Sequence, residues 1–117
     1  MAQAGASILL VEDDSSLRLV CRVNLELESF RVREAEDIHE ARAAVAAERP
    51  DLVFLDLHLT TGASDEFLEE LRADGIPVVL VSGTVDVTEY AGRATEVMPK
   101  PFDPADLVAA AHRHAAS

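Results

Sequence analysis

Five side chains that could carry out chemistry stand at, or directly after, the ends of apolar runs in the sequence. Three are acids, Glu12, Asp13 and Asp56, and the others are Ser82 and Lys100. Three carboxylates that share one pocket cannot all stay ionised without a compensating cation. Lys100 would offset one charge, and a hard divalent ion such as Mg²⁺, bound by carboxylates and water, would offset most of the rest. The pattern predicts a metal-compensated acidic pocket beside a hydroxyl and an ammonium group.

The apolar runs that carry these side chains have the lengths of β-strands. The strand candidates are residues 7–11, 30–34, 52–56, 76–82 and 95–99. Between them, apolar residues recur at helical spacing: Leu17, Val20, Cys21 and Leu25 within residues 15–28, then Ile38, Ala41, Ala44 and Val45, then Phe67, Leu68 and Leu71. This alternation predicts a parallel sheet with helices on both faces. Ligands bind such sheets at the carboxyl ends of the strands, so the candidate side chains should meet there.

The last two helical intervals of the sequence differ from each other. Asp103 is a candidate N-cap and Pro104 suits the first helical position, so a helix should begin there. Residues 83–95 instead contain glycines and several β-branched residues, which disfavour helix. We therefore expect a fourth helix that is short or disordered.

Length, composition and charge limit the class of protein. The 117 residues, 49% hydrophobic and 27% charged, predict one globular domain, residues 1–117, with an ordered core of about residues 7–115. The net charge of −12 would repel phosphate backbones, so no direct nucleic-acid partner is expected. No apolar run approaches the roughly 20 residues that span a bilayer, and the first residues lack the pattern of a signal peptide. A single cysteine, Cys21, allows no intramolecular disulfide, so we predict a cytoplasmic protein without membrane contact.

Four motifs, in this order, resemble the receiver domain of two-component response regulators: ILLVEDD, DLVFLDLHL, IPVVLVSG and PKPFDP. Each falls at a predicted strand end, and the resemblance covers about residues 7 to 115. It implies a (βα)5 fold, which is a doubly wound, flavodoxin-like α/β fold with a five-stranded parallel sheet. It also implies a phosphoprotein of a two-component or phosphorelay system, not an enzyme with a separate substrate.

The resemblance implies roles for the acidic residues. Asp56 is identified as the residue that accepts a phosphoryl group from a phosphohistidine of a partner protein. Asp13 and Asp56 would bind Mg²⁺ directly, together with the backbone carbonyl of His58, while Glu12 would act through water. The metal would neutralise charge on the phosphoryl oxygens during transfer.

The same resemblance assigns the other two residues to a conformational switch. Lys100 would pair with Asp56 before phosphorylation and with the phosphoryl group afterwards, and the Lys100–Pro101 peptide bond is expected to be cis. Ser82 would donate a hydrogen bond to a phosphoryl oxygen and pull the following loop inward. Val97 stands where the family usually has an aromatic residue, so the ring that usually moves with the hydroxyl is missing.

One receiver subclass, in which the fourth helix is reduced, shares several of these departures. Its fourth strand is preceded by Gly-Ile-Pro and ends in Phe-Ala-Thr-Gly, and here residues 75–77 are Gly-Ile-Pro and residues 80–83 are Leu-Val-Ser-Gly.

The partners that the resemblance implies are a sensor histidine kinase or a histidine phosphotransfer protein. A downstream protein partner would contact the surface that phosphorylation changes.

Two other functions fit some of these residues. The segment DLHLT resembles the Asp-x-Asp-x-Thr motif of haloacid-dehalogenase phosphatases, but His58 replaces the second aspartate, which is the general acid of that reaction. The other alternative is a protein-binding module on a receiver fold that acts without phosphorylation. The presence of the metal-binding acids, Asp56, Ser82 and Lys100 disfavours this alternative.

Several further polar residues have structural explanations. Asp14 and Ser15 are expected to cap the first helix, and Cys21 is expected to lie in the core. His112 and His114 fall in the last helical turns, where positive charge interacts favourably with the helix dipole.

Overall fold

The computed structural model describes residues 5–56, 61–83 and 92–115, which contain one five-stranded parallel sheet. The strands are β1 (Ser7–Val11), β2 (Arg31–Ala35), β3 (Leu52–Asp56), β4 (Val78–Ser82) and β5 (Glu96–Pro99), in the spatial order β2-β1-β3-β4-β5. This is the flavodoxin-like, doubly wound order, so the predicted fold class is confirmed. The fourth helix was expected to be short or disordered within residues 83–95, and residues 84–91 of this interval lie outside the described residues.

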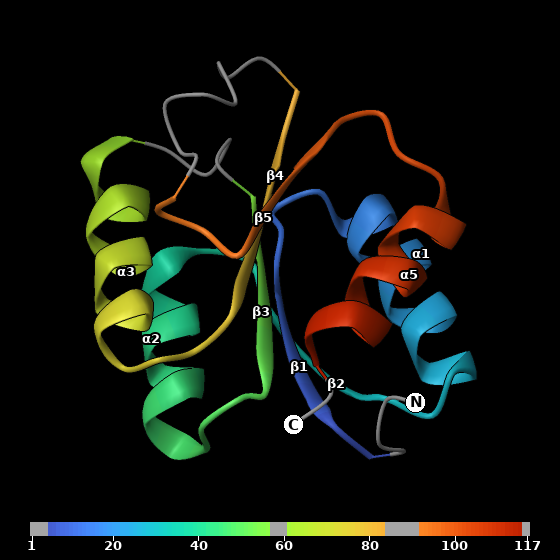
Figure 1. The fold of residues 1–117 in the computed structure, drawn as a ribbon, viewed down its shortest axis with the longest axis horizontal. Helices are drawn as coiled ribbons and strands as arrows, with labels where there is room; N and C mark the ends of the chain where they lie inside the picture. The colour runs from blue at the N-terminus through green and yellow to red at the C-terminus, as the bar shows by residue number, and fades with distance from the viewer. Residues whose placement is uncertain (1–4, 57–60, 84–91, 116–117) are drawn as a thin grey trace.

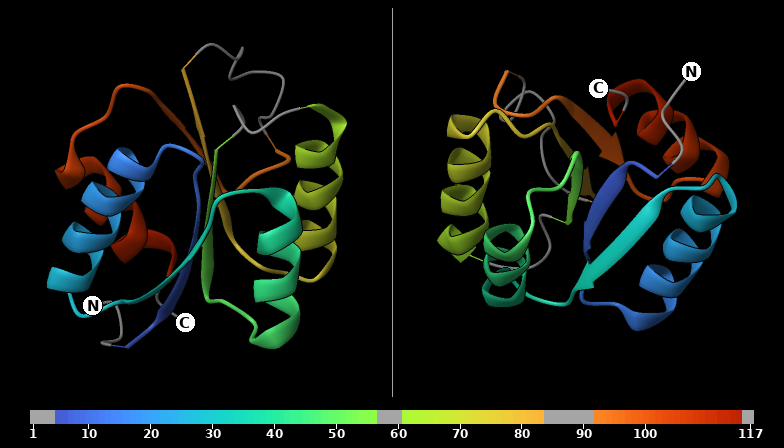
Figure 2. Two further views of the ribbon diagram at one scale, coloured as in Figure 1. Left: turned by 180° about the vertical axis from the view of Figure 1, so that it is seen from behind. Right: turned by 90° about the horizontal axis from the view of Figure 1, so that it is seen from below.

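Two pairs of helices cover the two faces of the sheet (Figures 1 and 2). Helices α1 (Ser15–Leu27) and α5 (Pro104–His114) lie on one face, and α2 (Ile38–Ala47) and α3 (Thr61–Ala73) lie on the other. The parallel strands direct their carboxyl ends to one edge of this three-layer arrangement. In the part of the chain that the structure describes, no helix is long and apolar enough to cross a bilayer.

The burial of the strands explains their composition. Every residue of β1, β3 and β4 is buried, because helices cover both faces of these central strands. Strand β2 lies at the edge of the sheet, and only its last residue, Ala35, is buried, whereas Arg31 and Glu34 are exposed. The central strands could therefore be found from continuous apolar runs, whereas β2 could not.

Three strands begin later than predicted. Strand β2 begins one residue late because the amide of Phe30 donates to the carbonyl of Leu25 (3.2 Å), which closes the turn after α1. Strand β4 begins at Val78, two residues late, because Pro77 has no N–H group to donate to a neighbouring strand. Strand β5 also begins one residue late.

Side chains of the strands alternate between two cores. Leu10 and Phe54 belong to the core under α1 and α5, together with Cys21, so the prediction that this thiol is buried is confirmed. Leu9 and Leu55 belong to the core under α2 and α3. This alternation decides on which side of the sheet the polar residues at the strand ends will lie.

Helix α1 follows the predicted periodicity with one exception. Its buried residues include Cys21 and Leu25, but Val20 is 46% exposed. Val20 belongs to an exposed apolar strip on α1 that also contains Leu19, Val23 and Leu27. The prediction that Val20 shares the apolar face of Cys21 is wrong, because the two side chains point about 100° apart around the helix axis.

Aspartates at the starts of the helices confirm two predicted caps. Asp14 accepts hydrogen bonds from two amides of the first turn of α1, at 2.9 and 3.2 Å. Ser15, also considered as a cap, is the first helical residue. Asp103 precedes α5, and its amide donates to the carboxylate of Asp106 (3.2 Å). The cap at Asp14 bears on the site because it fixes the chain directly after Glu12 and Asp13.

Candidate functional site

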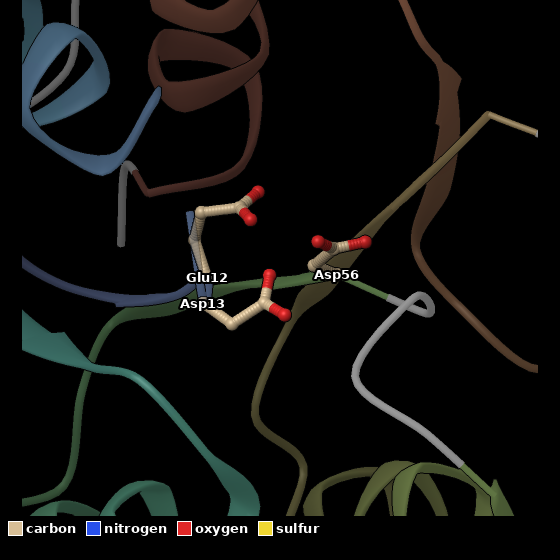
Figure 3. A group of neighbouring side chains, drawn as sticks. All are labelled: Glu12, Asp13 and Asp56. Carbon is tan, nitrogen blue, oxygen red and sulfur yellow. The ribbon is translucent and has the colours of Figure 1, made fainter. Parts of the chain in front are cut away.

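The acidic residues meet where β1 and β3 end side by side. These strands pair with Val11 opposite Leu55, so Glu12 and Asp56 are the next neighbours along the ladder. Both continue the alternation toward the core of α1 and α5, because Leu10 and Phe54 lie two residues earlier on the same side. Figure 3 shows the carboxylates of Glu12 and Asp13 extending from the end of β1 toward that of Asp56.

The three carboxylates are close enough to share a cation. One oxygen from each of Glu12, Asp13 and Asp56 can be chosen so that all three lie within 4.8 Å of one another. Asp56 is 1% exposed and Glu12 is 4% exposed, whereas Asp13 is open to solvent. The sequence predicted this grouping, and Asp13 forms its solvent-exposed side.

Lys100 supplies positive charge at this cluster. Its Nζ donates to Asp56 Oδ2 (3.0 Å) and to Glu12 Oε1 (3.2 Å), so the expected pairing with Asp56 is confirmed. The backbone amide of Lys100 donates to the carbonyl of Ser82 (2.8 Å), which ties the end of β5 to the end of β4. The Lys100–Pro101 bond is cis, as predicted.

Burial, hydrogen bonds and charge shift the pKa values of Glu12 and Lys100. Burial raises the pKa of Glu12 to about 7, helped by the hydrogen bond and negative charge of Asp56, while the amide of Asp14 and the charge of Lys100 act against this rise. Burial acts to lower the pKa of Lys100, but hydrogen bonds and negative charge from Asp56 and Glu12 outweigh it and raise this pKa. One ammonium therefore does not compensate both buried carboxylates, and the deficit favours an added cation.

Glu12 is held by several hydrogen bonds besides the one from Lys100. Its amide donates to the carbonyl of Ala35 on β2 (3.0 Å), and its Oε2 accepts from the amide of Asp14 (3.0 Å). Its carbonyl accepts from Nη1 of Arg18 (2.7 Å), a residue of α1. Sequence reasoning did not identify Arg18. The available signal was its position in the first turn of the helix that directly follows the acids, where its side chain can reach back to them.

The other predicted site residues are placed as follows. Ser82 is 6% exposed at the end of β4, next to the strand that carries Asp56. His58, whose carbonyl was expected to bind the metal, lies outside the described residues. Val97 is partly buried and packs against the core of α2 and α3. The roles assigned to these residues stay predictions.

The sequence is similar to known regulatory proteins. It is 32% identical over 120 residues to the KDP operon transcriptional regulatory protein KdpE of Escherichia coli (strain K12), covering 95% of this chain and 53% of KdpE. It is 36% identical over 107 residues to the DNA-binding response regulator MtrA of Mycobacterium tuberculosis (strain ATCC 25618 / H37Rv), covering 87% of this chain and 47% of MtrA. The chain thus spans about half the length of the curated relatives it matches.

The fold and a family model give the same assignment. The receiver domain of NtrX from Brucella abortus superposes with a TM-score of 0.80 at 30% identity, covering 92% of this chain and 97% of that one. The chemotaxis protein CheY4 of Vibrio cholerae superposes with a TM-score of 0.83 at 25% identity, covering 95% and 99% of the two chains. The model described as "Response regulator receiver domain" matches residues 8–112. With this match and the acidic cluster at the strand ends, the chain belongs to the family of response regulator receiver domains.

Proposed function

We propose that Asp56 of this receiver domain accepts a phosphoryl group from a phosphohistidine of a sensor histidine kinase or a histidine phosphotransfer protein. The observation that carries this proposal is the buried Asp56 carboxylate, which lies within 4.8 Å of two further carboxylates and 3.0 Å from the ammonium of Lys100. Burying two carboxylates beside one ammonium group, with a third carboxylate nearby, is unfavourable for stability alone, so the cluster fits a functional role. Family membership removes the support for the haloacid-dehalogenase alternative.

The transfer would form a bond between phosphorus and a carboxylate oxygen of Asp56. The P–N bond of the phosphohistidine would break, and the imidazole would leave with its electron pair. Catalysis of such a transfer is mostly positioning and electrostatic stabilisation. Lys100 holds Asp56 in place before the transfer and would interact with a phosphoryl oxygen afterwards. Ser82, at the end of the adjacent strand, would donate to another phosphoryl oxygen.

The donor set fits Mg²⁺, which prefers carboxylate oxygens and keeps several water ligands. Asp13 and Asp56 would bind the ion, and Glu12 would act through water. The bound ion would supply positive charge that stabilises the phosphoryl oxygens. Asp13, being exposed, can exchange water for the ion at little cost, whereas Glu12 and Asp56 gain a counter-charge for their buried carboxylates.

Output through contacts with a downstream protein is part of the proposal. The names of KdpE and MtrA describe a transcriptional regulatory protein and a DNA-binding response regulator. Neither transcriptional regulation nor DNA binding is proposed for these 117 residues, and the expectation that they make no direct nucleic-acid contact stays a prediction.

We also propose that residues 1–117 form one domain and that this domain catalyses only its own phosphorylation and slow dephosphorylation. The placement in the Phe-Ala-Thr-Gly subclass stays a prediction.

The test is the intact mass of the protein after incubation with acetyl phosphate and Mg²⁺. Wild type should gain one phosphoryl group, and Asp56→Asn should gain none. A chelator should abolish the gain. The control variant is Asp14→Asn, because Asn caps helices as well as Asp does and Asp14 is the acid next to the cluster; it should be phosphorylated like wild type.

Beryllofluoride binding, followed by NMR, provides a second test for the case in which this receiver does not accept a phosphoryl group from acetyl phosphate. A complex with wild type and none with Asp56→Asn would support the phospho-acceptor role even if acetyl phosphate does not react. If neither reagent modifies wild type, the proposal fails. The phosphorylation-independent binding module would then be the better explanation of the fold.

A further inference from the structure

We infer that Arg18 is a positioning residue for the metal-binding acids: its guanidinium fixes the peptide between Glu12 and Asp13 and thereby raises the affinity of the cluster for Mg²⁺. This inference rests on the proposed function. The contacts that carry it are a hydrogen bond from Arg18 Nη1 to the carbonyl of Glu12 (2.7 Å) and one from Arg18 Nε to Glu34 Oε1 (3.0 Å).

The carbonyl that Arg18 contacts belongs to the peptide bond that joins the two acids. Because a peptide unit is planar, fixing this oxygen also fixes the direction in which the chain enters Asp13. The amide of Glu12 is already fixed on Ala35 of β2 (3.0 Å), and Asp14 is fixed as the cap of α1. Arg18 completes this support at the exposed acid, which has no strand pairing of its own in the described part of the chain.

Two features make Arg18 suited to this role. The guanidinium is a rigid fork that can donate to two acceptors at once, which a lysine ammonium does with less precision. Glu34 holds the fork from the neighbouring strand β2, and the Arg18 side chain is only 17% exposed. The acids are therefore connected through one side chain to both α1 and β2.

Charge and position make opposite predictions for the loss of Arg18. Arg18 carries a positive charge near a site for a positive ion, so electrostatics alone predicts that removing it would strengthen Mg²⁺ binding. Loss of positioning predicts weaker binding, because residues that orient metal ligands typically contribute about 10-fold to 100-fold to metal affinity. The direction of the change thus separates the two roles.

Arg22 provides the matched control. It lies one turn further along α1 and pairs with the same carboxylate, 3.3 Å from Glu34 Oε2. Among the described residues it makes no hydrogen bond to Glu12. Arg22→Met therefore removes the same charge and the same ion-pair partner as Arg18→Met, but leaves the peptide between the acids untouched.

The experiment is isothermal titration of Mg²⁺ into wild type, Arg18→Met, Arg18→Lys and Arg22→Met, together with urea unfolding of each. Methionine keeps an apolar stem of similar length, so packing is largely retained. We expect the dissociation constant to rise about 10-fold in Arg18→Met and to be unchanged or lower in Arg22→Met. Arg18→Lys should be intermediate, because its ammonium can replace one of the two hydrogen bonds.

Each outcome decides between the claims. Equal or tighter Mg²⁺ binding by Arg18→Met would overturn the positioning role and leave the proposed function intact. Absence of Mg²⁺ binding by wild type would overturn the proposed function and this inference with it. If Arg18→Met does not fold, Arg18→Lys decides, since affinity equal to wild type would contradict a role that depends on both hydrogen bonds.

Discussion

At the scale of single residues, the central feature is a pair of buried carboxylates that both contact one ammonium group. Glu12 and Asp56 share one ammonium group, that of Lys100, which lies 3.2 and 3.0 Å from them. Burial of a second carboxylate without its own counter-charge is unfavourable, and the raised pKa of Glu12 expresses this. The site is thus prepared for a cation at some expense to the stability of the metal-free protein.

Replacing Glu12 by Gln should change how the stability of the metal-free protein depends on pH. The pKa of Glu12 in the folded state is about 7, above its ordinary value of 4.5, so the folded state keeps a proton that the unfolded state releases between these values. Wild type should lose roughly 1 to 3 kcal/mol of stability between pH 5 and pH 8 through this group. The loss should be absent from Glu12→Gln. Urea unfolding in chelator at several pH values measures it.

An exposed glutamate of α1, Glu26, provides the control for this experiment. Glu26→Gln should give a pH profile parallel to that of wild type. If the profile of Glu12→Gln is also parallel to wild type across this pH range, then Glu12 is not the group that couples stability to pH.

At the scale of elements, the ends of strands and helices position every member of the site. The paired ends of β1 and β3 place Glu12 beside Asp56, and the start of α1 fixes the turn that carries Asp13. Away from the acidic cluster, the histidines of α5 contact Glu96, the first residue of β5, and Glu28, the residue directly after α1. His114 Nε2 lies 2.7 Å from Glu96 Oε1, and His112 Nε2 lies 2.9 Å from Glu28 Oε1. Both histidines lie in the last turn of α5, as predicted.

Two leucines of α1 provide a test of how this helix is seated on the sheet. Leu25 is 0% exposed and Leu27 is 76% exposed, although they lie two residues apart in one helix. Leu25→Ala should cost about 2 to 5 kcal/mol of unfolding free energy because it leaves a cavity. Leu27→Ala should change stability by less than about 0.5 kcal/mol. Urea unfolding of both variants measures the difference, and equal losses would mean that α1 is rotated or covered differently in solution.

At the scale of the whole molecule, the net charge of −12 lowers the stability of the folded chain through repulsion between its many acidic groups. Self-repulsion destabilises a compact acidic chain, and any salt reduces it by screening. A specific ion adds a further contribution because it binds the folded state at one place. The two contributions can be separated because only the specific one depends on the geometry of the acidic cluster.

Mg²⁺ should therefore stabilise the protein more than NaCl does at the same ionic strength. Binding to the folded state alone contributes about 2.7 kcal/mol when the ion is present at 100 times its dissociation constant. Asp13→Asn should lose this excess but keep the response to NaCl, because Asp13 is exposed and its loss does not disturb the core. Thermal unfolding in matched salts measures both effects. An equal response of wild type to the two salts would indicate that the cluster binds no ion specifically.

The sequence by itself determined the class of fold and the residues that gather in the site. Continuous apolar runs identified β1, β3 and β4, because strands covered on both faces have no polar positions to interrupt the pattern. The position of Glu12, Asp13, Asp56 and Lys100 at the ends of such strands then implied their meeting, since parallel strands bring their carboxyl ends to one edge. Local rules also sufficed for the caps at Asp14 and Asp103, because a cap involves only neighbouring residues.

Other features were decided only by the tertiary structure. The exposure of Val20 and the late start of β2 depend on how α1 is turned against the sheet and how its last turn closes at Phe30. The raised pKa of Glu12 depends on burial and on Asp56 at the end of β3, against the opposing charge of Lys100, and both residues lie far from Glu12 in the sequence. The contact of Arg18 with the Glu12 carbonyl and with Glu34 joins β1, α1 and β2. Each of these requires distances between segments, and a spacing pattern along the chain does not contain them.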